Sequence, residues 1–361
     1  MQNEQPKVTA HVMTSNNRKT TIYDIAQLSG ASPSTVSAVL NGTWMRRRIS
    51  KKTVELISKT ATDAGYFINM QARGLRRARS GLVGMIVPAH DNRFFSSLGQ
   101  EFDRLARERG LCPVIASTLR SPQEEKRIVE TLISYAIDAL FIAGATDSEQ
   151  LGAICAAANL KHIYIDLPGR DAPSVVTDNF KGAQLLTRKI LAEVPQNLTG
   201  LRARSYFIGG SANDYATALR IEAFRKTVEE TGEVVDEAQV IQCGYAPRNA
   251  AEAIAQLCER IGGLPACLFV NSLTAFEGVM SYFASLPTTA FSGSAIGCFD
   301  YDPFAAFLHF PVFMIRQNSN QLITKAYELF DSGNTSSVVI QVEPELIEPR
   351  TIAIQSLSDL G

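Results

Sequence analysis

The residues of this sequence best suited to binding chemistry are the basic ones near its start. Residues 1–80 hold 13 lysines and arginines against four acidic residues, a net charge of +9. Residues 81–361 hold 22 basic and 32 acidic residues, a net charge of −10. This asymmetry indicates a polyanionic partner for the first part alone. A solvated basic tail is the simpler alternative, but the helical pattern within the block counts against it.

Patterns typical of catalysis or metal binding are few. The sequence has no P-loop and no Gly-x-Ser-x-Gly motif, and its four histidines lack metal-ligand spacing: His11, His90, His162 and His309. The catalytic-looking groups are His90-Asp91 and Asp300-Tyr301-Asp302, which fit better as ligand-cleft or helix-capping residues. The six cysteines lie far apart with no CxxC pair, which favours free thiols in a reducing cytoplasm. We therefore expect no enzyme activity, no metal and no cofactor.

Three short amphipathic helices are predicted to position the basic groups. Capping residues and glycines delimit them: Thr21 with Asp24 and Gly30 for the first, Ser32 with Pro33 and Asn41-Gly42 for the second, and Ser50 with Gly65 for the third. Two short helices joined by a tight glycine turn are typical of the helix-turn-helix motif.

From Leu82 onward, short apolar runs alternate with amphipathic segments. The apolar runs predict strands at 82–87, 113–116, 139–143, 162–165, 205–209, 239–242, 267–270, 294–298 and 338–342. Helices are predicted between them, near 95–109, 122–135, 148–158, 180–192, 215–231, 248–261, 272–285 and 318–331. This alternation predicts two parallel sheets, each covered by helices on both faces. No apolar run approaches the roughly 20 residues that span a bilayer, so no membrane segment is expected.

The segment 21–42, TIYDIAQLSGASPSTVSAVLNG, resembles the headpiece signature of the lactose/galactose repressor (LacI/GalR) family. That signature is a helix, an A-G-V/A-S turn and then T-V-S-x-V-L-N. The rest of the chain resembles the family's core, and the segments 43–48, 48–55, 277–279 and 299–311 are similar to its fructose repressor (catabolite repressor/activator) branch. The resemblance implies an α/β core of two doubly wound parallel-sheet lobes, like the type I periplasmic binding proteins, after an all-α helix-turn-helix domain.

The resemblance also implies four parts of the chain. Residues 1–19 are expected to be a disordered extension, 20–67 the helix-turn-helix DNA-binding domain, 68–80 a hinge helix and 81–361 a two-lobed ligand-binding and dimerisation domain. The expected first lobe comprises about 81–178 and 313–335, and the second about 179–312 and 336–361.

For DNA, the family places its second helix in the major groove. The positions that match its base-reading residues are Pro33, Ser34 and Ala38. Ala38 stands where arginine is frequent, so it offers only an apolar contact, for instance to a thymine methyl group. Thr35, Ser37 and Asn41 suit phosphate contacts, which position the helix without reading bases. Thr21 and Arg48 are also expected to bind DNA.

The segment Arg73-Gly74-Leu75-Arg76 aligns with the family's hinge helix. In the family, the hinge folds on the operator and its leucine wedges into a minor-groove step, and Leu75 is the matching residue. Arg73 and Arg76 can neutralise flanking phosphates. Ile68 stands where the family usually has proline, which makes the entry into the hinge less rigid.

The family's ligand cleft carries over onto seven residues of the core: Asp91, Phe94, Phe95, Asp166, Arg220, Asn271 and Asp300. Carboxylates, an asparagine and one arginine with aromatic walls suit a polyhydroxylated ligand, because each acid can accept from sugar hydroxyls. Leu167 replaces the arginine that many members of the fructose branch carry after the first-lobe aspartate, which weakens the case for a sugar phosphate.

The resemblance thus implies a transcriptional regulator of the repressor type, not an enzyme. Its expected partners are double-stranded operator DNA, a second copy of the chain in a homodimer, and a small effector: a sugar, a sugar phosphate or a polyol. A sugar-binding solute receptor or a carbohydrate enzyme with the same core is the alternative. The basic headpiece and the polar N-terminus, unlike an export signal, favour a cytoplasmic, nucleoid-associated regulator.

Overall fold

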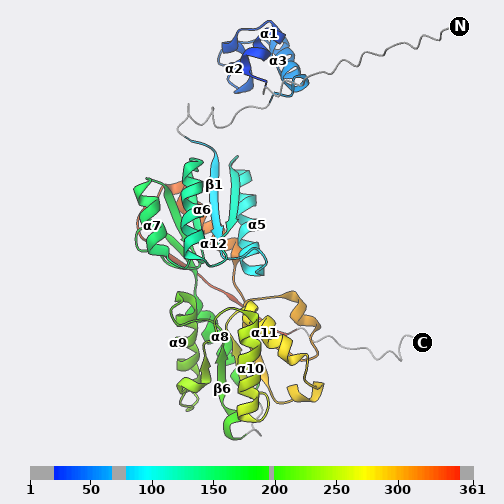
Figure 1. The fold of residues 1–361 in the computed structure, drawn as a ribbon, viewed down its shortest axis with the longest axis vertical. Coiled ribbons are helices and arrows are strands. Elements are labelled where there is room, and N and C mark those ends of the chain that lie inside the picture. The colour runs from blue at the N-terminus through cyan, green and yellow to red at the C-terminus, as the bar shows by residue number, and fades with distance from the viewer. Residues whose placement is uncertain (1–19, 67–78, 195–198, 350–361) are drawn as a thin grey trace, which may run out of the picture. The chain divides into compact units, whose positions relative to one another are not determined.

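The computed structural model describes residues 20–66, 79–194 and 199–349 of the chain. The chain divides into two compact units, residues 1–80 and 81–361, each of which has its own core (Figure 1). Within the described ranges, no helix is both long and apolar enough to cross a membrane.

The first unit is a three-helix domain made of α1 (Ile22–Ser29), α2 (Pro33–Leu40) and α3 (Lys51–Asp63). Its small core takes buried side chains from all three helices: Ile25, Ala26, Val36, Val39, Ile57 and Ala61. Trp44 and Ile49, on the segment between α2 and α3, pack against this core. The sequence predicts all three helices within about two residues of their observed ends.

The second unit contains two six-stranded sheets, which define two lobes. The first-lobe sheet has the order β11-β5-β4-β3-β1-β2, and all its pairs are parallel. Its strands are β1 (Leu82–Val87), β2 (Cys112–Ser117), β3 (Ala139–Ala143), β4 (Lys161–Ile165), β5 (Ser174–Thr177) and β11 (Val339–Val342). Its helices are α5 (Arg93–Glu108), α6 (Pro122–Ser134), α7 (Ser148–Ala157) and α12 (Ser319–Ser332).

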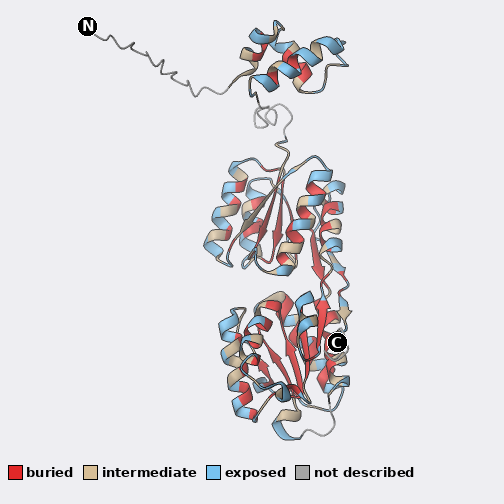
Figure 2. Ribbon diagram, turned by 90° about the vertical axis from the view of Figure 1, so that its right-hand side faces the viewer, coloured by how far each residue is buried: buried red, intermediate tan, exposed pale blue. Residues whose placement is uncertain are grey.

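Alternating strand residues bury the two faces of this sheet under different helices. On β4, Ile163 and Ile165 pack with the cluster that includes α5 and α12, whereas Tyr164 packs with the cluster of α6 and α7. The central strands are therefore buried on both faces, as Figure 2 shows in red for both lobes, while the outer faces of the helices meet solvent.

The second-lobe sheet has the order β12-β10-β9-β8-β6-β7 and is parallel except for β12, which runs antiparallel to β10. Its strands are β6 (Ser205–Ile208), β7 (Val240–Ile241), β8 (Cys267–Val270), β9 (Ala295–Phe299), β10 (Val312–Arg316) and β12 (Glu345–Ile347). Helices α8 (Asn179–Ala192) and α9 (Tyr215–Glu229) cover one face, and α10 (Pro247–Ile261) and α11 (Leu273–Phe283) cover the other. Short 3-10 helices lie at Gly200–Ala203, Glu237–Gln239, Thr288–Phe291 and Pro303–Phe307. The predicted fold class, two doubly wound lobes after a helix-turn-helix domain, is confirmed.

Two of the three expected lobe crossings are misplaced. The first lies near residue 178 as expected, between β5 and α8. The expected lobe bounds put the second crossing between 312 and 313, but β10 belongs to the second-lobe sheet, so the chain crosses after Arg316. The same bounds put the third crossing between 335 and 336, but β11 pairs with β5 of the first lobe, so the chain crosses after Val342. Strand pairing across the sheet, which no local pattern encodes, decides both.

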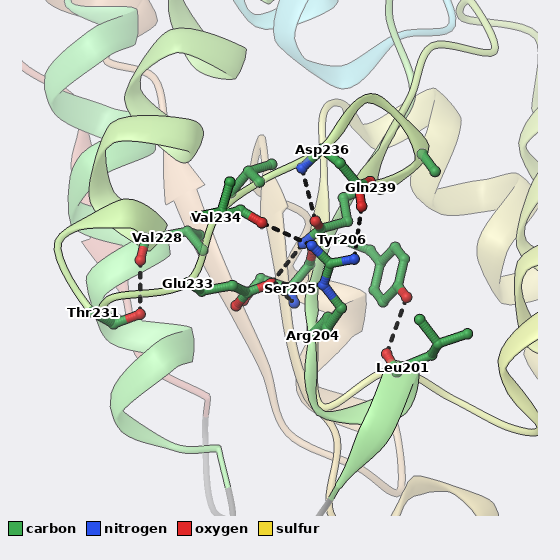
Figure 3. A network of polar contacts seen from close by, with 12 residues as sticks. Leu201, Arg204, Ser205, Tyr206, Val228, Thr231, Glu233, Val234, Asp236 and Gln239 are labelled. Atoms are coloured by element: carbon green, nitrogen blue, oxygen red, sulfur yellow. Dashed lines mark hydrogen bonds and ion pairs between the residues drawn. The ribbon is translucent and has the colours of Figure 1, made fainter.

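A polar network at the start of β6 stabilises the second lobe at the amino-terminal end of this strand, opposite the carboxyl ends of the strands. The Glu233 carboxylate accepts hydrogen bonds from the Ser205 amide and hydroxyl, both at 3.0 Å, and from Gln239 Nε2 at 2.6 Å (Figure 3). Arg204 Nη1 donates to Asp236 Oδ2 at 2.7 Å. These bonds satisfy the buried Gln239 and Ser205 and hold the segment after α9 against the sheet.

Candidate nucleic-acid interface and ligand cleft

Side-chain caps hold the two helices of the headpiece motif in place. Thr21 and Asp24 form a capping box: the Thr21 amide donates to Asp24 Oδ2 at 2.7 Å, and the Asp24 amide donates to Thr21 Oγ1. Gly30 ends α1 in the left-handed conformation with φ of 67°, which a residue without Cβ adopts at little cost. Ser32 caps α2 through the Thr35 amide. Thr21 thus has a structural role that does not depend on DNA.

The exposed start of α2 agrees with a base-reading role for two of the three expected residues. Pro33 and Ser34 are exposed, and the Ser34 hydroxyl lies 2.8 Å from that of Ser32. Ala38, by contrast, is only 3% exposed. The chain after α2 folds back there, with the Thr43 amide donating to the Ala38 carbonyl at 2.9 Å. The burial of Ala38 opposes the expected contact between its methyl group and a base, which stays a prediction.

The residues expected to contact phosphates, Thr35, Ser37 and Asn41, already have hydrogen-bond contacts within the headpiece. Asn41 Nδ2 donates to the Ser37 carbonyl at 2.8 Å and to Ser37 Oγ at 3.1 Å, so Asn41 and Ser37 are joined at the end of α2. The Thr35 hydroxyl shares a contact of 2.8 Å with Ser32. Phosphate contacts by these residues remain a prediction, and they would compete with or extend these local bonds.

The loop between α2 and α3 is a well-anchored basic projection. Trp44 and Ile49 pack on the headpiece core, and the Ile49 amide donates to the Trp44 carbonyl at 3.0 Å. Between them Arg46, Arg47 and Arg48 are exposed, and Arg48 has φ of 52°. The anchor holds three positive charges next to the end of α2, where they can meet a phosphate backbone. Only Arg48 of the three was among the expected DNA-binding residues. The expected hinge residues Arg73, Leu75 and Arg76 lie outside the described residues.

In the core, residues that follow the strands of the two lobes come together and define a cleft. Arg93, after β1, pairs with Asp302, after β9, at 2.8 Å. Arg120, after β2, lies with its guanidinium carbon 4.3 Å from the centre of the Tyr245 ring, after β7. This is the edge at which open parallel sheets bind ligands.

Arg220 is the central buried cation of this cleft. It is 4% exposed, and its guanidinium lies 3.7 Å from the centre of the Phe299 ring. Its Nε donates to Asn179 Oδ1 at 2.9 Å, and its Nη1 donates to the Asn271 carbonyl at 2.7 Å. These bonds fix the guanidinium in one orientation while its charge acts on the nearby carboxylates of Asp166 and Asp300.

Two buried oxygen acceptors of the cleft have no hydrogen-bond partner within the described part of the chain: Asp166 Oδ1 and Asn271 Oδ1. Asn271 Nδ2 donates to Thr217 Oγ1 at 3.0 Å, so its carbonyl oxygen is turned away from Thr217. Asp166 has left-handed backbone geometry, with φ of 72°. Leaving buried acceptors unsatisfied costs about 1–3 kcal/mol each, so a ligand that donates hydrogen bonds would relieve that cost.

The pKa of Asp166 is strongly perturbed by this environment. Burial is the main cause that raises the pKa of Asp166 to about 7; the carboxylates of Asp214 and Asp300 add to the rise, and Arg220 and Arg120 oppose it. An acid whose pKa is shifted by burial and by specific charged neighbours in a cleft is typical of a binding site.

Both carboxylate oxygens of Asp300 already accept hydrogen bonds within the protein, near the point where the chain crosses between the lobes. Its Oδ1 accepts from Gln317 Nε2 at 2.7 Å and its Oδ2 from the Leu273 amide at 3.1 Å. Gln317 Oε1 in turn accepts from the Thr177 hydroxyl of the first lobe at 2.6 Å. Burial raises the pKa of Asp300. Its backbone also has a positive φ of 125°. A ligand at Asp300 would therefore compete with bonds that join the two lobes.

The three residues after β1 that were expected in the ligand cleft lie in different places: Phe94 in the cleft, Phe95 in the core and Asp91 on the surface. Phe94 lines an open pocket together with Arg93, Asp300, Tyr301 and Arg316. Phe95 is 5% exposed and packs in the first-lobe core, which opposes its expected role as a cleft wall. Asp91 is exposed. The alternation of a helical first turn, in which neighbouring side chains point to different faces, separates Phe94 from Phe95.

Several residues of the cleft were not predicted from the sequence. Arg120 follows β2 as Asp166 follows β4, so its position after a strand was a usable signal. Thr217 lies one helical turn before Arg220 on α9 and shares its face. Tyr245 donates to Asp214 Oδ2 at 2.7 Å, and only the fold brings these two together. Gln317 directly follows β10, and because β10 was not predicted, Gln317 was not predicted either.

Comparison with known protein families gives two matches that together span most of the chain. Residues 21–69 match the model "Bacterial regulatory proteins, lacI family", and residues 83–306 match "Periplasmic binding protein domain". The first match covers the described three-helix unit, and the second covers most of the two lobes.

Individual relatives point the same way. The chain is 46% identical over 193 residues to the ribitol operon repressor of Klebsiella aerogenes, covering 54% of this chain and 71% of that protein. It is 26% identical over 317 residues to the catabolite repressor/activator of Escherichia coli K12, covering 85% and 90%. A structure of the lac repressor dimer bound to operator and the anti-inducer ONPF matches with a TM-score of 0.77 at 18% identity, covering 92% and 99% of the two chains. With both family models matched and a relative at 46% identity, the chain belongs to the lacI family of bacterial regulatory proteins.

Proposed function

We propose that this protein is a homodimeric, operator-binding repressor that releases DNA when an uncharged polyol or sugar binds between the lobes of its core. The observation that carries the effector class is the pair of buried acceptors, Asp166 Oδ1 and Asn271 Oδ1, beside Arg220. Neighbouring hydroxyl groups of a polyol are both donors and acceptors, so they suit two acceptors flanking a guanidinium.

The charges of the cleft favour an uncharged ligand over a phosphorylated one. Asp166 and Asp300 both have carboxylates in it, and Arg220 already donates to Asn179 and Asn271. A phosphate group beside Asp166 and Asp300 would meet repulsion from these carboxylates, while Arg220, the buried cation next to them, already donates to protein acceptors. Leu167 follows Asp166 in place of an arginine. The name of the ribitol operon repressor, at 46% identity, agrees with a polyol.

For DNA, we assign base contacts to the exposed start of α2, at Pro33 and Ser34, and phosphate contacts to the loop that carries Arg48. Residues 68–80 are proposed to be the hinge, with Leu75 as the wedge. Two copies of the headpiece in a dimer would read a pseudo-palindromic site, since paired helix-turn-helix units bind half-sites about one helical turn apart. A repressor of this kind acts in the cytoplasm, at the nucleoid.

The test is a ligand screen coupled to DNA binding. Thermal-shift screening of ribitol, xylitol, arabinitol, ribose and their phosphates should raise the melting temperature with an uncharged compound, because a ligand stabilises the state that it binds. The same compound should release the protein from a selected operator fragment. Stabilisation by the phosphorylated compounds alone would overturn the effector class, and DNA binding without sequence preference at moderate salt would overturn the repressor function.

A further inference from the structure

The turn that carries Asp166 is joined to β4 by a hydrogen-bonded cluster of three side chains: His162, Tyr164 and Asp171. β4 ends at Ile165, and residues 166–173 return the chain to β5. The Asp166 amide donates to the Val175 carbonyl at 3.0 Å, and the Gly169 amide donates to Ser174 Oγ at 2.9 Å. Asp171, at the far side of this turn, reaches back to β4.

Asp171 joins two side chains of β4. Its Oδ2 lies 3.1 Å from His162 Nε2, and its Oδ1 accepts a hydrogen bond from the Tyr164 hydroxyl at 2.9 Å. The same hydroxyl lies 2.9 Å from the Ser148 carbonyl at the start of α7. Tyr164 is fully buried and His162 is 9% exposed, whereas the Asp171 side chain is 40% exposed. The cluster therefore ties an exposed residue of the turn to the buried strand and to the start of α7.

Two glycines make room for this cluster. A Cβ atom at Gly169 would overlap the Tyr164 ring, and one at Gly152 on α7 would overlap the Tyr164 hydroxyl and the Asp171 carboxylate. Neither glycine is among the residues with positive φ, so space rather than backbone conformation requires them. The local sequence is therefore fitted to the tyrosine and aspartate on both sides.

The hydrogen-bond pattern of His162 makes Asp171 specific. His162 Nδ1 lies 3.2 Å from the Leu160 carbonyl, which can only accept, and Nε2 faces the Asp171 carboxylate. Both contacts are satisfied when the ring carries a proton on each nitrogen. An asparagine at 171 would satisfy the same contacts with a neutral ring, by accepting from Tyr164 and donating to Nε2. An alanine would satisfy neither.

We propose that Asp171 is a positioning residue for effector binding: clamped by His162 and Tyr164, it fixes the 166–173 turn and thereby the placement of Asp166 in the cleft. This inference rests on the proposed role of Asp166 in the effector site. Since Asp166 Oδ1 has no partner of its own, the turn is what holds that carboxylate in place.

The experiment compares Asp171→Ala, Asp171→Asn and the milder Tyr164→Phe in the full-length chain, with Arg170→Ala as control. Arg170 is on the same turn but its side chain is 88% exposed. Hydrogen exchange of residues 166–173 reports the turn without any ligand, and calorimetric titration with ribitol reports the effector site. Melting temperature and operator affinity are measured alongside.

We expect Asp171→Ala to speed exchange in the turn and to weaken ribitol binding by about tenfold or more, with operator affinity unchanged. Tyr164→Phe should give a smaller change in the same direction, while Asp171→Asn and Arg170→Ala should stay close to wild type. Unchanged exchange in the turn of Asp171→Ala would overturn the inference. So would equal losses in the alanine and asparagine variants, which would show a need for charge rather than for the clamp. If wild type fails to bind ribitol or any other uncharged compound, the effector class is wrong, while the exchange data still decide the role of Asp171 in the turn.

Discussion

Replacing Asp166 with asparagine should stabilise the protein while removing its response to the effector. The carboxylate lies in the cleft with Oδ1 unpartnered, and burial raises its pKa to about 7, against 3.8 for an ordinary aspartate. Holding the ionised form in the folded protein therefore costs free energy, and asparagine removes that cost. A binding site kept at the expense of stability is expected to behave in this way.

The size and pH dependence of the gain follow from the two pKa values. Each pKa unit corresponds to about 1.4 kcal/mol, so a rise of about three units amounts to about 4 kcal/mol at pH 8, where both folded and unfolded states are ionised. At pH 5 the folded state keeps its proton and the gain falls to about 2 kcal/mol. Because the folded-state pKa is raised, wild type loses stability as the pH rises from about 4 to about 7, and Asp166→Asn does not.

Urea denaturation of full-length wild type and Asp166→Asn at pH 5 and pH 8 measures both values. The control is Asp147→Asn, which makes the same change at the exposed cap of α7, where Oδ1 accepts from the Gln150 amide at 2.9 Å. Asparagine caps about as well as aspartate, so the control should change stability by less than about 0.5 kcal/mol. A difference between wild type and Asp166→Asn that is the same at both pH values, or that favours wild type at pH 8, would refute the reasoning.

Effector binding should show the opposite pH dependence. Hydroxyl donors are held better by the ionised carboxylate, so affinity for an uncharged polyol should fall below pH 7, by at most about tenfold per pH unit. Isothermal titration between pH 5.5 and 8 tests this in wild type, and an affinity that does not fall below pH 7 would contradict it.

Three further changes test the other parts of the structure. Arg47→Gln should reduce the slope of log affinity for DNA against log salt by about 0.9 if the loop contacts one phosphate, whereas Arg248→Gln on the core should leave that slope unchanged. Leu75→Ala should weaken binding to the selected operator far more than to random DNA, and equal losses would reject the wedge. Arg220→Ala should destabilise the core by about 3–5 kcal/mol, because it leaves buried carboxylates without their cation; a loss below 1 kcal/mol in urea denaturation would show that Arg220 is not a structural cation.

The elements of the headpiece and most of the core follow from local patterns. Thr21, Ser32 and Ser50 cap their helices as predicted, because capping depends on side chains within three residues of the helix start. Strands such as β1 and β3 are continuous apolar runs bounded by polar residues, and the sequence predicts both with the observed ends.

The missed elements depend on distant pairing. β5, β10 and β12 are short and lie next to prolines at 173, 311 and 344, so their local patterns are weak. Their sheet assignment decides where the chain crosses between the lobes. Contacts that use those crossings, such as Thr177 with Gln317, could not be predicted from spacing.

The positions of the expected site residues likewise depend partly on local pattern and partly on packing between distant segments. Arg220 and Asp166 lie in the cleft, where the family pattern implies them, since each follows or faces a strand end. Ala38 and Phe95 are buried instead, because the chain after α2 folds back over one and the first-lobe core takes the other. A family pattern gives positions, but the packing of this chain decides which side chains remain accessible.

The most direct test of the central proposal is operator binding measured with and without an uncharged polyol. Fluorescence anisotropy on a fragment selected from genomic DNA, with random DNA as competitor, reports sequence preference and release together. We expect tight binding by wild type, release by a polyol that also raises the melting temperature, and binding without release by Asp166→Asn. Release of Asp166→Asn at the same polyol concentration as wild type would contradict the assignment of the cleft, and equal affinity for selected and random DNA would contradict the repressor function itself.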